Sequence, residues 1–441
     1  MKRLRHILLV GSIGLIGADR IDLLAGHGSF ILTPFLFLAP LVLLIGLSLG
    51  GPHKVFRVSP LPSMRRQIPF VSGLCLFLFL TFGSILFSLD PMRSLVAFCD
   101  LVLVAFLGYC ISLQILAEPD QERLIAHSVT FALVMYVFFC VAECVAFSQG
   151  LTINSQRTGS WIQSTFAPST LLNIVPVLSG TTFDANRSGF VLMMYSALLD
   201  WFAAKWRYAT FCRVFIFLLI LLTFSRSAGL CWLAYNLFSK SLWQKILSRR
   251  VLVKMLCVAA IISALCITYQ RELSAFLEAW EISEAVSAKL SMDPGSSGAS
   301  HILLIERGIK TWLSSPKTMV AGIGFAAAPQ VLQDFFQDDK HGNFHSLYVT
   351  TLAEMGLPAF FVLMFILVYP LIGRIGAFPC IAAIMVFNVS YQTHMEPMLW
   401  LSLAIVWSHE RGHSLLGVPA ALLSDFGEGI AMTARDQQAN L

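Results

Sequence analysis

Stretches of about 20 mostly apolar residues recur along the whole chain, and this is the length that an α-helix needs to cross a bilayer. We place twelve such segments in the 441 residues, near 5–18, 29–51, 69–89, 95–116, 125–147, 188–204, 209–225, 227–239, 251–269, 345–370, 375–392 and 397–409. The seventh and eighth are almost continuous and are interrupted only at Ser225-Arg226-Ser227, where we expect a sharp reversal at a membrane surface. The pattern predicts an all-α, polytopic membrane protein with about 12 transmembrane helices.

The composition excludes the main alternatives to a membrane protein. Charged residues make up 12% of the chain and hydrophobic residues 57%, whereas soluble domains carry about 25% charged residues. Too little charge remains to cover a soluble surface, so a soluble enzyme, a disordered chain and a fibrous repeat are excluded. The basic residues behind the net charge of +5 lie between apolar runs, which argues against nucleic-acid binding. The ten cysteines lie in or beside apolar segments and are interpreted as small buried hydrophobic residues.

Basic residues predict the orientation of the bundle. With the N-terminus inside, the inner loops carry twelve of them: Lys54, Arg57, Arg65, Arg66, Arg123, Lys205, Arg207, Lys240, Lys245, Arg249, Arg250 and Arg374. The opposite short loops carry five, namely Arg20, Arg93, Arg157, Arg187 and Arg226. Both termini are therefore expected to be cytoplasmic, and the first span is expected to be kept rather than cleaved as a signal peptide.

Two loops on the outer side, near 148–187 and 270–344, are too long to be simple connectors. Loops longer than about 12–15 residues are usually functional or disordered. We therefore divide the chain into nine transmembrane helices at 1–269, a large outer loop at 270–344, three transmembrane helices at 345–409 and a cytoplasmic tail at 410–441.

The larger loop is expected to contain helices of its own. The spacing of one apolar helical face occurs twice in it, at Leu273, Phe276, Leu277 and Trp280 and again at Ile302, Ile305, Ile309 and Trp312. A flexible break at 293–298, with the sequence Asp-Pro-Gly-Ser-Ser-Gly, separates the two stripes. The two helices are predicted to lie over the outer face, either as a simple lid or as a cap over an active site.

Four polar residues fall on the predicted outer rim: Arg187, Arg226, Arg307 and His345. Arginines there oppose the positive-inside trend and would suit a diphosphate, because a guanidinium binds phosphate oxygens in a bidentate manner. A histidine among them could act as a general base. Each residue alone has a simpler explanation, since an interfacial Arg often reaches lipid headgroups and a His at a helix start often bonds to backbone.

The sequence around His345 resembles the hallmark of the O-antigen ligase and polymerase superfamily. That pattern is His followed by Asn, Ser or Gln, then nine residues, then Gly-x-x-Gly. Here His345-Ser346, nine residues and Gly356 fit, while Ala359 replaces the second glycine. Three further segments resemble the family in order and spacing: 183–189 with Asn186 and Arg187, the Ser-Arg-Ser turn of 223–229, and 306–325 with Arg307.

The resemblance implies a GT-C-like membrane glycosyltransferase in the bacterial inner membrane, with its active site facing the periplasm. It would move a glycan from an undecaprenyl-diphosphate carrier to an acceptor hydroxyl, with no cofactor and no metal. His345 would take the proton of the acceptor hydroxyl, and Arg226 and Arg307 would hold the diphosphate, with Arg187 as a weaker candidate. The acceptor would be lipid A-core in a ligase, a second carrier-linked glycan in a polymerase, or a protein hydroxyl in some members.

Three further residues near His345 are interpreted as supporting ones. Tyr348 lies one helical turn away and could orient the histidine. Glu354 lies about 13 Å deeper along the helix, too far to reach the same substrate atom, and is expected to pack or support. Gly322, Gly324 and Gly356 are expected where the backbone needs positive φ or close approach. The pair Asp338-Asp339 is interpreted as a solvated loop rather than a metal site.

Two other functions stay open from the sequence. A polymerase would use the same chemistry to build an O-antigen or exopolysaccharide. A flippase or transporter of lipid-linked glycans belongs to a different class, and would place charges near the bilayer midplane and often show internal repeats. The cations at one rim and the large outer loop favour an enzyme that works at the membrane surface. A purely structural scaffold would leave the order of the motifs unexplained.

Overall fold

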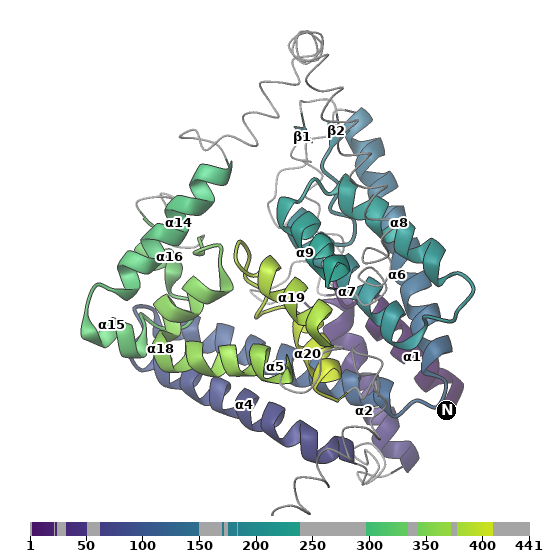
Figure 1. Ribbon diagram of the computed structural model, residues 1–441, viewed down its shortest axis with the longest axis horizontal. Helices are drawn as coiled ribbons and strands as arrows, with labels where there is room; N and C mark the ends of the chain where they lie inside the picture. The colour runs from purple at the N-terminus through teal and green to yellow at the C-terminus, as the bar shows by residue number, and fades with distance from the viewer. Residues whose placement is uncertain are drawn as a thin grey trace, which may run out of the picture.

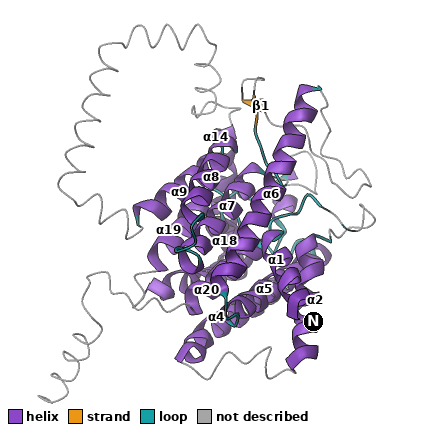
Figure 2. Ribbon diagram, turned by 90° about the vertical axis from the view of Figure 1, so that its right-hand side faces the viewer, coloured by secondary structure: helices purple, strands orange, loops and turns teal. Residues whose placement is uncertain are grey.

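The computed structural model describes residues 2–21, 23, 32–50, 62–149, 170–171, 175–182, 184–238, 297–333, 342–371 and 377–408. This part of the chain is helical (Figure 2), apart from a two-residue antiparallel ladder of β1 (Thr170–Leu171) and β2 (Val175–Pro176). The first helices are α1 (Lys2–Gly14), α2 (Pro34–Gly50), α4 (Pro62–Ile85), α5 (Pro91–Leu116), α6 (Gln121–Ser148), α7 (Ala185–Phe202), α8 (Ala209–Leu222) and α9 (Arg226–Leu237). The later ones are α14 (Ser297–Trp312), α15 (Pro316–Ala321), α16 (Ala328–Val331), α18 (Leu347–Val368), the 3-10 turn η1 (Tyr369–Leu371), α19 (Phe378–Phe387) and α20 (Pro397–Ser408).

Helices occupy the segments that the apolar runs predicted, as Figure 1 shows along the chain. The predicted span at 251–269, the first amphipathic stripe at 273–280 and the tail at 410–441 lie outside the described residues. Among the described helices, four are long and apolar enough to cross a membrane: Gln67–Ile85, Pro91–Leu116, Gln121–Ser148 and Leu347–Leu371. The segments Pro34–Gly46, α8, α19 and α20 are apolar but shorter. The total of about 12 crossings therefore stays a prediction.

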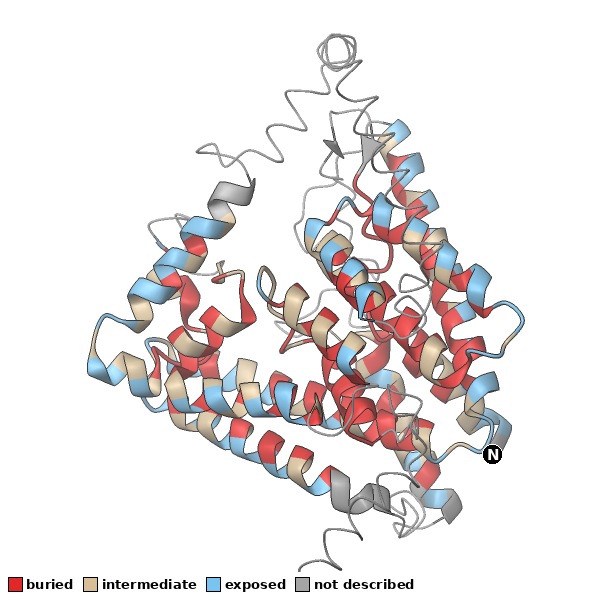
Figure 3. Ribbon diagram, viewed as in Figure 1, coloured by how far each residue is buried: buried red, intermediate tan, exposed pale blue. Residues whose placement is uncertain are grey.

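The outward faces of the long helices are apolar. On α4, Phe79 is 69% exposed and Leu76 48%, and on α6, Val134 and Phe138 are each 62% exposed. Figure 3 shows this division, with buried residues toward the middle of the bundle and exposed ones on its outer faces. A surface of large exposed apolar side chains is stable against lipid tails rather than against water.

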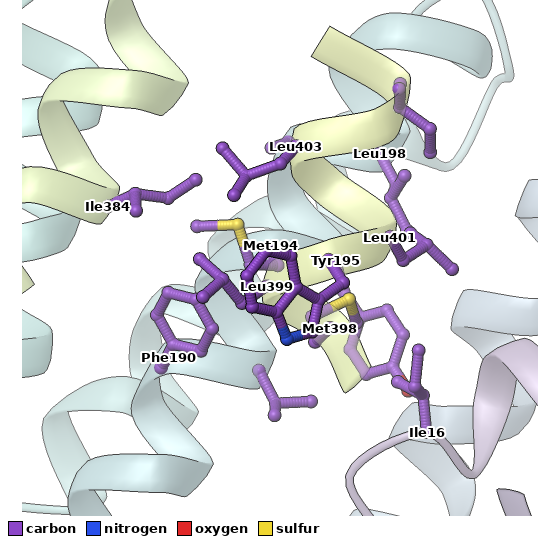
Figure 4. Packing of buried hydrophobic residues seen from close by; sticks show 14 of the residues in the cluster. Ile16, Phe190, Met194, Tyr195, Leu198, Ile384, Met398, Leu399, Leu401 and Leu403 are labelled. Atoms are coloured by element: carbon purple, nitrogen blue, oxygen red, sulfur yellow. The ribbon is translucent and has the colours of Figure 1, made fainter. Parts of the chain in front are cut away.

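The centre of the bundle is formed by α7 and α20, which are buried on nearly all sides. Met194 and Tyr195 of α7 lie close to Met398 and Leu399 of α20 (Figure 4). The Tyr195 hydroxyl donates to the carbonyl oxygen of Ile13 at 2.8 Å, so α1 is fastened to the same core. Helices that are hydrophobic all round need neighbours on every side, which explains this central position.

Many helices begin or terminate together on one side of the bundle, which we call the rim end. Arg20, just beyond α1, pairs with Glu143 near the end of α6 at 2.8 Å. Asn186 in the first turn of α7 accepts a 2.6 Å hydrogen bond from Ser225, which precedes α9. The backbone N–H of Leu347, the first residue of α18, donates to carbonyl oxygens that follow α19. The beginnings of α7, α9 and α18 therefore lie at the same end.

At the crossing of α15 and α18, two glycines have the positive φ that the sequence predicted. Gly356 has a φ of +81° and Gly322 a φ of +70°. A Cβ on Gly356 would lie 2.1 Å from the carbonyl oxygen of Val320, and one on Gly322 would lie 2.2 Å from that of Glu354. The two backbones touch here, so this crossing needs glycine on both sides.

Gly356→Ala is expected to lower the free energy of unfolding by about 2–4 kcal/mol, because left-handed backbone and a clash with backbone both oppose a side chain. Gly83→Ala is the matched control, since a Cβ there meets nothing within 4 Å. Thermal unfolding of the purified protein in detergent or nanodiscs measures both. Equal melting temperatures for the two variants would contradict the close crossing of α15 and α18.

Candidate functional site

His345 is held in an unusual backbone conformation directly before α18. Its φ is +50°, in the left-handed region that residues other than glycine rarely adopt. Its backbone N–H donates to Oδ1 of Asn343 at 2.8 Å. On the other side, the N–H of Leu347 is held by the carbonyl oxygens of Asn388 and Tyr391. Such strain persists only where the surroundings fix it, and it gathers at functional sites.

The imidazole of His345 lies against that of His301 on α14. The ring centroids are 4.1 Å apart and the ring planes are tilted by 31°. Burial, together with the neighbouring His301, lowers the pKa of His345 to about 4. His345 is therefore neutral near pH 7 and has a nitrogen lone pair with which to accept a proton.

The buried face of α14 differs from the predicted one. The stripe was expected to include Ile302 and Ile309, but these are 44% and 40% exposed. The face turned inward instead carries Leu304, which is 2% exposed, and the two residues His301 and Gly308. Gly308 explains the rotation, because a Cβ there would lie 2.4 Å from the side chain of Val349 on α18. The helix approaches α18 on Gly308 and Leu304. Of the predicted stripe, Ile305 and Trp312 pack against the same cluster while Ile302 and Ile309 do not.

Arg226 is exposed and is the first residue of α9, at the break that the sequence predicted. The preceding Ser225 caps the helix through the N–H of Ala228 and also bonds to Asn186. Ser227 lies within 2.6 Å of Ser390, the two hydroxyls forming a hydrogen bond. The charge of Arg226 is close enough to lower the pKa of His301, after burial of that ring. Arg226 and the two histidines thus share one region of the rim end.

Arg187 lies at the same end, but its guanidinium is engaged by two carboxylates. It pairs with Asp19 and, at 2.6 Å, with Glu396. Asp19 is 6% exposed and Glu396 5%, so both depend on Arg187 for charge balance. Arg187 therefore joins the segment after α1 to the start of α20. Its predicted contact with diphosphate stays a prediction.

Arg307 lies on the same helix as His301 but on another face. It is about 9 Å further along the axis, is exposed, and lines a pocket of about 340 Å³. The other lining residues are Leu303, Leu304, Glu306, Lys310, Val331 and Leu332. The structure therefore places Arg307 on the helix that carries the second histidine, facing a pocket between α14 and α16.

The three supporting residues hold backbone rather than His345 itself. The hydroxyl group of Tyr348 donates a hydrogen bond to the carbonyl oxygen of Met385 on α19 at 2.9 Å. The buried carboxylate of Glu354 accepts from the N–H groups of Ala326 and Ala328, at 2.9 and 3.0 Å. Gly356 provides the close crossing described above. These contacts fix α18, and with it the position from which His345 projects.

Within the described ranges, three or more His, Cys, Asp or Glu side chains do not gather into a group that could hold a metal ion. Asp338 and Asp339 lie outside those ranges. The expectation of a metal-independent site therefore stays a prediction.

The sequence reasoning overlooked His301 and Asp184. His301 could have been found, because it lies four residues before Ile305 and seven before Gly308, which places it on the same helical face. Asp184 was noted only as part of a motif. It caps α7 through the N–H groups of Asn186 and Arg187, and its charge raises the pKa of His301, against the effect of Arg226.

One protein family matches part of this chain. Residues 211–364, about a third of the chain, match the family described as O-antigen ligase. This match supports the resemblance to the O-antigen ligase and polymerase superfamily. The matched residues include Arg226, Arg307 and His345. No curated protein matches the chain.

The match supports an O-antigen ligase or polymerase type of function, and the apolar helices indicate a membrane protein. The matched family implies substrates of one general kind, lipid-linked glycans. The apolar helices agree with this assignment, since a lipid-linked substrate is presented at the bilayer surface.

Arg187→Ala is expected to destabilise the protein by about 3 kcal/mol, because it leaves two buried carboxylates without their partner. Arg226→Ala is the matched control, since that side chain is exposed and its loss is expected to change stability by less than about 1 kcal/mol. Thermal unfolding of both purified variants measures the difference. An Arg187→Ala protein as stable as the wild type would show that the ion pairs contribute nothing and would restore the case for a free, substrate-binding Arg187.

Proposed function

We propose that the protein is an inner-membrane glycosyltransferase of the O-antigen ligase type. It transfers a glycan from an undecaprenyl-diphosphate carrier to a hydroxyl of lipid A-core at the periplasmic face. The observation that carries this proposal is the neutral, backbone-strained His345, which lies against His301 within reach of the charge of Arg226, at one end of an apolar bundle. The family match over 211–364 supports the type of chemistry.

His345 acts as the general base in this proposal. Because burial keeps its imidazole neutral, it can accept the proton of the acceptor hydroxyl as that oxygen attacks the anomeric carbon. The new C–O bond forms while the bond between the anomeric carbon and the phosphate oxygen breaks, and the electron pair leaves with undecaprenyl diphosphate. A bound diphosphate raises the proton affinity of His345 when it is needed, because an anion nearby stabilises the imidazolium. Direct attack inverts the anomeric configuration, as the family resemblance implies.

The rim end is suited to an anion for two independent reasons. The N-termini of α7, α9 and α18 lie together there, and helix N-termini attract negative charge. Arg226 adds a full positive charge on an exposed side chain. In the proposal Arg226 holds the diphosphate from α9, and Arg307 approaches it from α14. Arg187 fastens the rim, with its charge shared between Asp19 and Glu396.

The proposed membrane topology rests on the distribution of basic residues between the loops. The excess of basic residues in alternate loops supports cytoplasmic termini, with the loops near 148–187 and 270–344 in the periplasm. The opposite end of the bundle, where Arg5 bonds to Gln114 at 2.7 Å, then faces the cytoplasm. In this proposal His345 faces the periplasm, where it meets a glycan on its lipid carrier.

His345→Ala is expected to reduce glycan transfer at least 100-fold, because a positioned general base typically contributes 10²–10⁴-fold. His127→Ala is the control, since His127 packs against His6 on the other side of the bundle. The measurement is complementation of a gene deletion in the native host, followed by gel analysis of the envelope polysaccharides. Full complementation by His345→Ala would overturn the assignment and favour a transporter.

The same gels separate the two enzymatic readings. Long chains that are missing from lipid A-core and accumulate on the undecaprenyl carrier indicate a ligase. A core that carries a single repeat unit, or the loss of free high-mass polysaccharide, indicates the polymerase, which is the second candidate.

Arg226→Ala is expected to lower transfer by about 100-fold, and Arg226→Lys by less, because lysine keeps the charge but loses bidentate phosphate binding. Arg123→Ala, an exposed arginine near the start of α6, is the control. The readout is the same polysaccharide gel, normalised to the amount of protein in the membrane. Wild-type levels with Arg226→Ala would remove Arg226 from the diphosphate site.

A further inference from the structure

Two histidines that are 44 residues apart in the sequence lie ring against ring at the rim end. His345 belongs to the loop before α18, and His301 to the first turns of α14. Both rings are partly buried. Only His345 has a role in the proposed reaction, so the position of His301 needs its own explanation.

The contact results from how α14 is seated on α18. Gly308, two turns beyond His301, lets the helix approach Val349 and Phe344 at a distance that no larger residue would permit. Leu304 fills the next inward position and is 2% exposed. His301 is the polar member of this otherwise apolar face, and it lies where the face reaches His345. A leucine there would complete the apolar stripe, so packing alone does not require an imidazole.

The arrangement of the rings favours stacking over proton transfer between them. A proton passes between two imidazoles along a line in the ring planes, with nitrogens about 2.9 Å apart. Here the planes are inclined by only 31° with centroids 4.1 Å apart, which places one ring over the other. Such a contact restricts rotation of the His345 ring and lets the charge on one ring act on the other.

We propose that His301 is a positioning residue for His345. By stacking, His301 fixes the orientation of the His345 imidazole. It also sets the pH range in which His345 is available as a base. The inference rests on the proposed function of His345. His301 itself touches no reacting atom in this scheme.

The charges around the pair define the pH dependence. Arg226 faces His301 from α9, Asp184 faces it from the cap of α7, and His345 faces it from α18. Burial and Arg226 lower the pKa of His301, while Asp184 raises it. The two histidines titrate as a coupled pair, since a proton on one disfavours a proton on the other. Removing the titratable group at 301 therefore raises the pKa of His345.

The test needs no glycan substrate. The full chain in lipid nanodiscs is treated with diethyl pyrocarbonate, which modifies neutral imidazole, and the rate at His345 is followed by peptide mass spectrometry between pH 3 and 8. His301→Phe, which keeps a stacking ring without a charge, is expected to move the midpoint at His345 upward by about half a pH unit. His301→Ala is expected to show the same shift and a faster reaction, because the ring is uncovered. His127→Phe is the control and leaves His345 unchanged.

The polysaccharide gel provides the second readout. His301→Phe is expected to reduce glycan transfer by no more than about threefold, whereas His301→Ala reduces it at least tenfold. Rescue by phenylalanine distinguishes ring positioning from a general loss of fold. An unchanged midpoint at His345 in His301→Phe, or equal losses with phenylalanine and alanine, overturns the proposal.

The two readouts also separate this inference from the proposed function. If His345→Ala supports normal polysaccharide while His301→Phe still shifts the titration of His345, the histidines are coupled but the glycosyltransferase assignment is wrong. If His345→Ala abolishes transfer and neither His301 variant alters the titration or the gel, the enzyme assignment stands and His301 has no positioning role.

Discussion

The requirement that every backbone polar group in a membrane be hydrogen-bonded governs this structure. Within lipid only helices meet it for a chain of this kind, so irregular backbone is confined to places where helices end. The three described residues other than glycine with positive φ, Phe224, Ala326 and His345, all lie in such junctions. The strained position of His345 is possible because it lies outside regular helix, and Arg226 is exposed at the first residue of α9. The same constraint that makes the bundle apolar therefore concentrates its chemistry at the rim end.

Much of the fold could be predicted from the sequence, because the signals are local. Apolar runs gave the helix positions, and the Ser-Arg-Ser break gave the start of α9 at Arg226. The positive φ of Gly356 was also predicted. The inward face of α14 was not predicted correctly. The prediction used the isoleucine spacing and did not consider Gly308, whose close approach to Val349 rotates the helix. Ion pairs between residues far apart in the sequence could not be predicted either. Arg187 pairs with carboxylates that lie 168 and 209 residues away in the chain.

These distant ion pairs show how a bundle with few charges fixes its functional end. Arg20 and Glu143 are 0% and 2% exposed as side chains, and the guanidinium also bonds to the hydroxyl of Ser179. The carboxylate of Glu143 further accepts from the N–H groups of Ser179 and Gly180. A buried ion pair of this kind contributes little net stability, but removing one partner is costly. The pairs therefore fix where the segment after α1 contacts the loop before α7. In this way they also fix the position of the N-terminus of α7.

The placement of buried acidic groups also bears on the choice between an enzyme and a transporter. A transporter that moves protons or ions needs a carboxylate near the membrane midplane that is free to change partners. Among the described residues, Asp100 lies partly buried within α5, while Glu354 lies well inside α18 and both of its oxygens accept backbone N–H groups from the segment around α16. Protonation would break one of these bonds and release Ala326 or Ala328 from the bundle. Glu354 thus anchors the segment between α15 and α18, which argues against a transport role for this carboxylate.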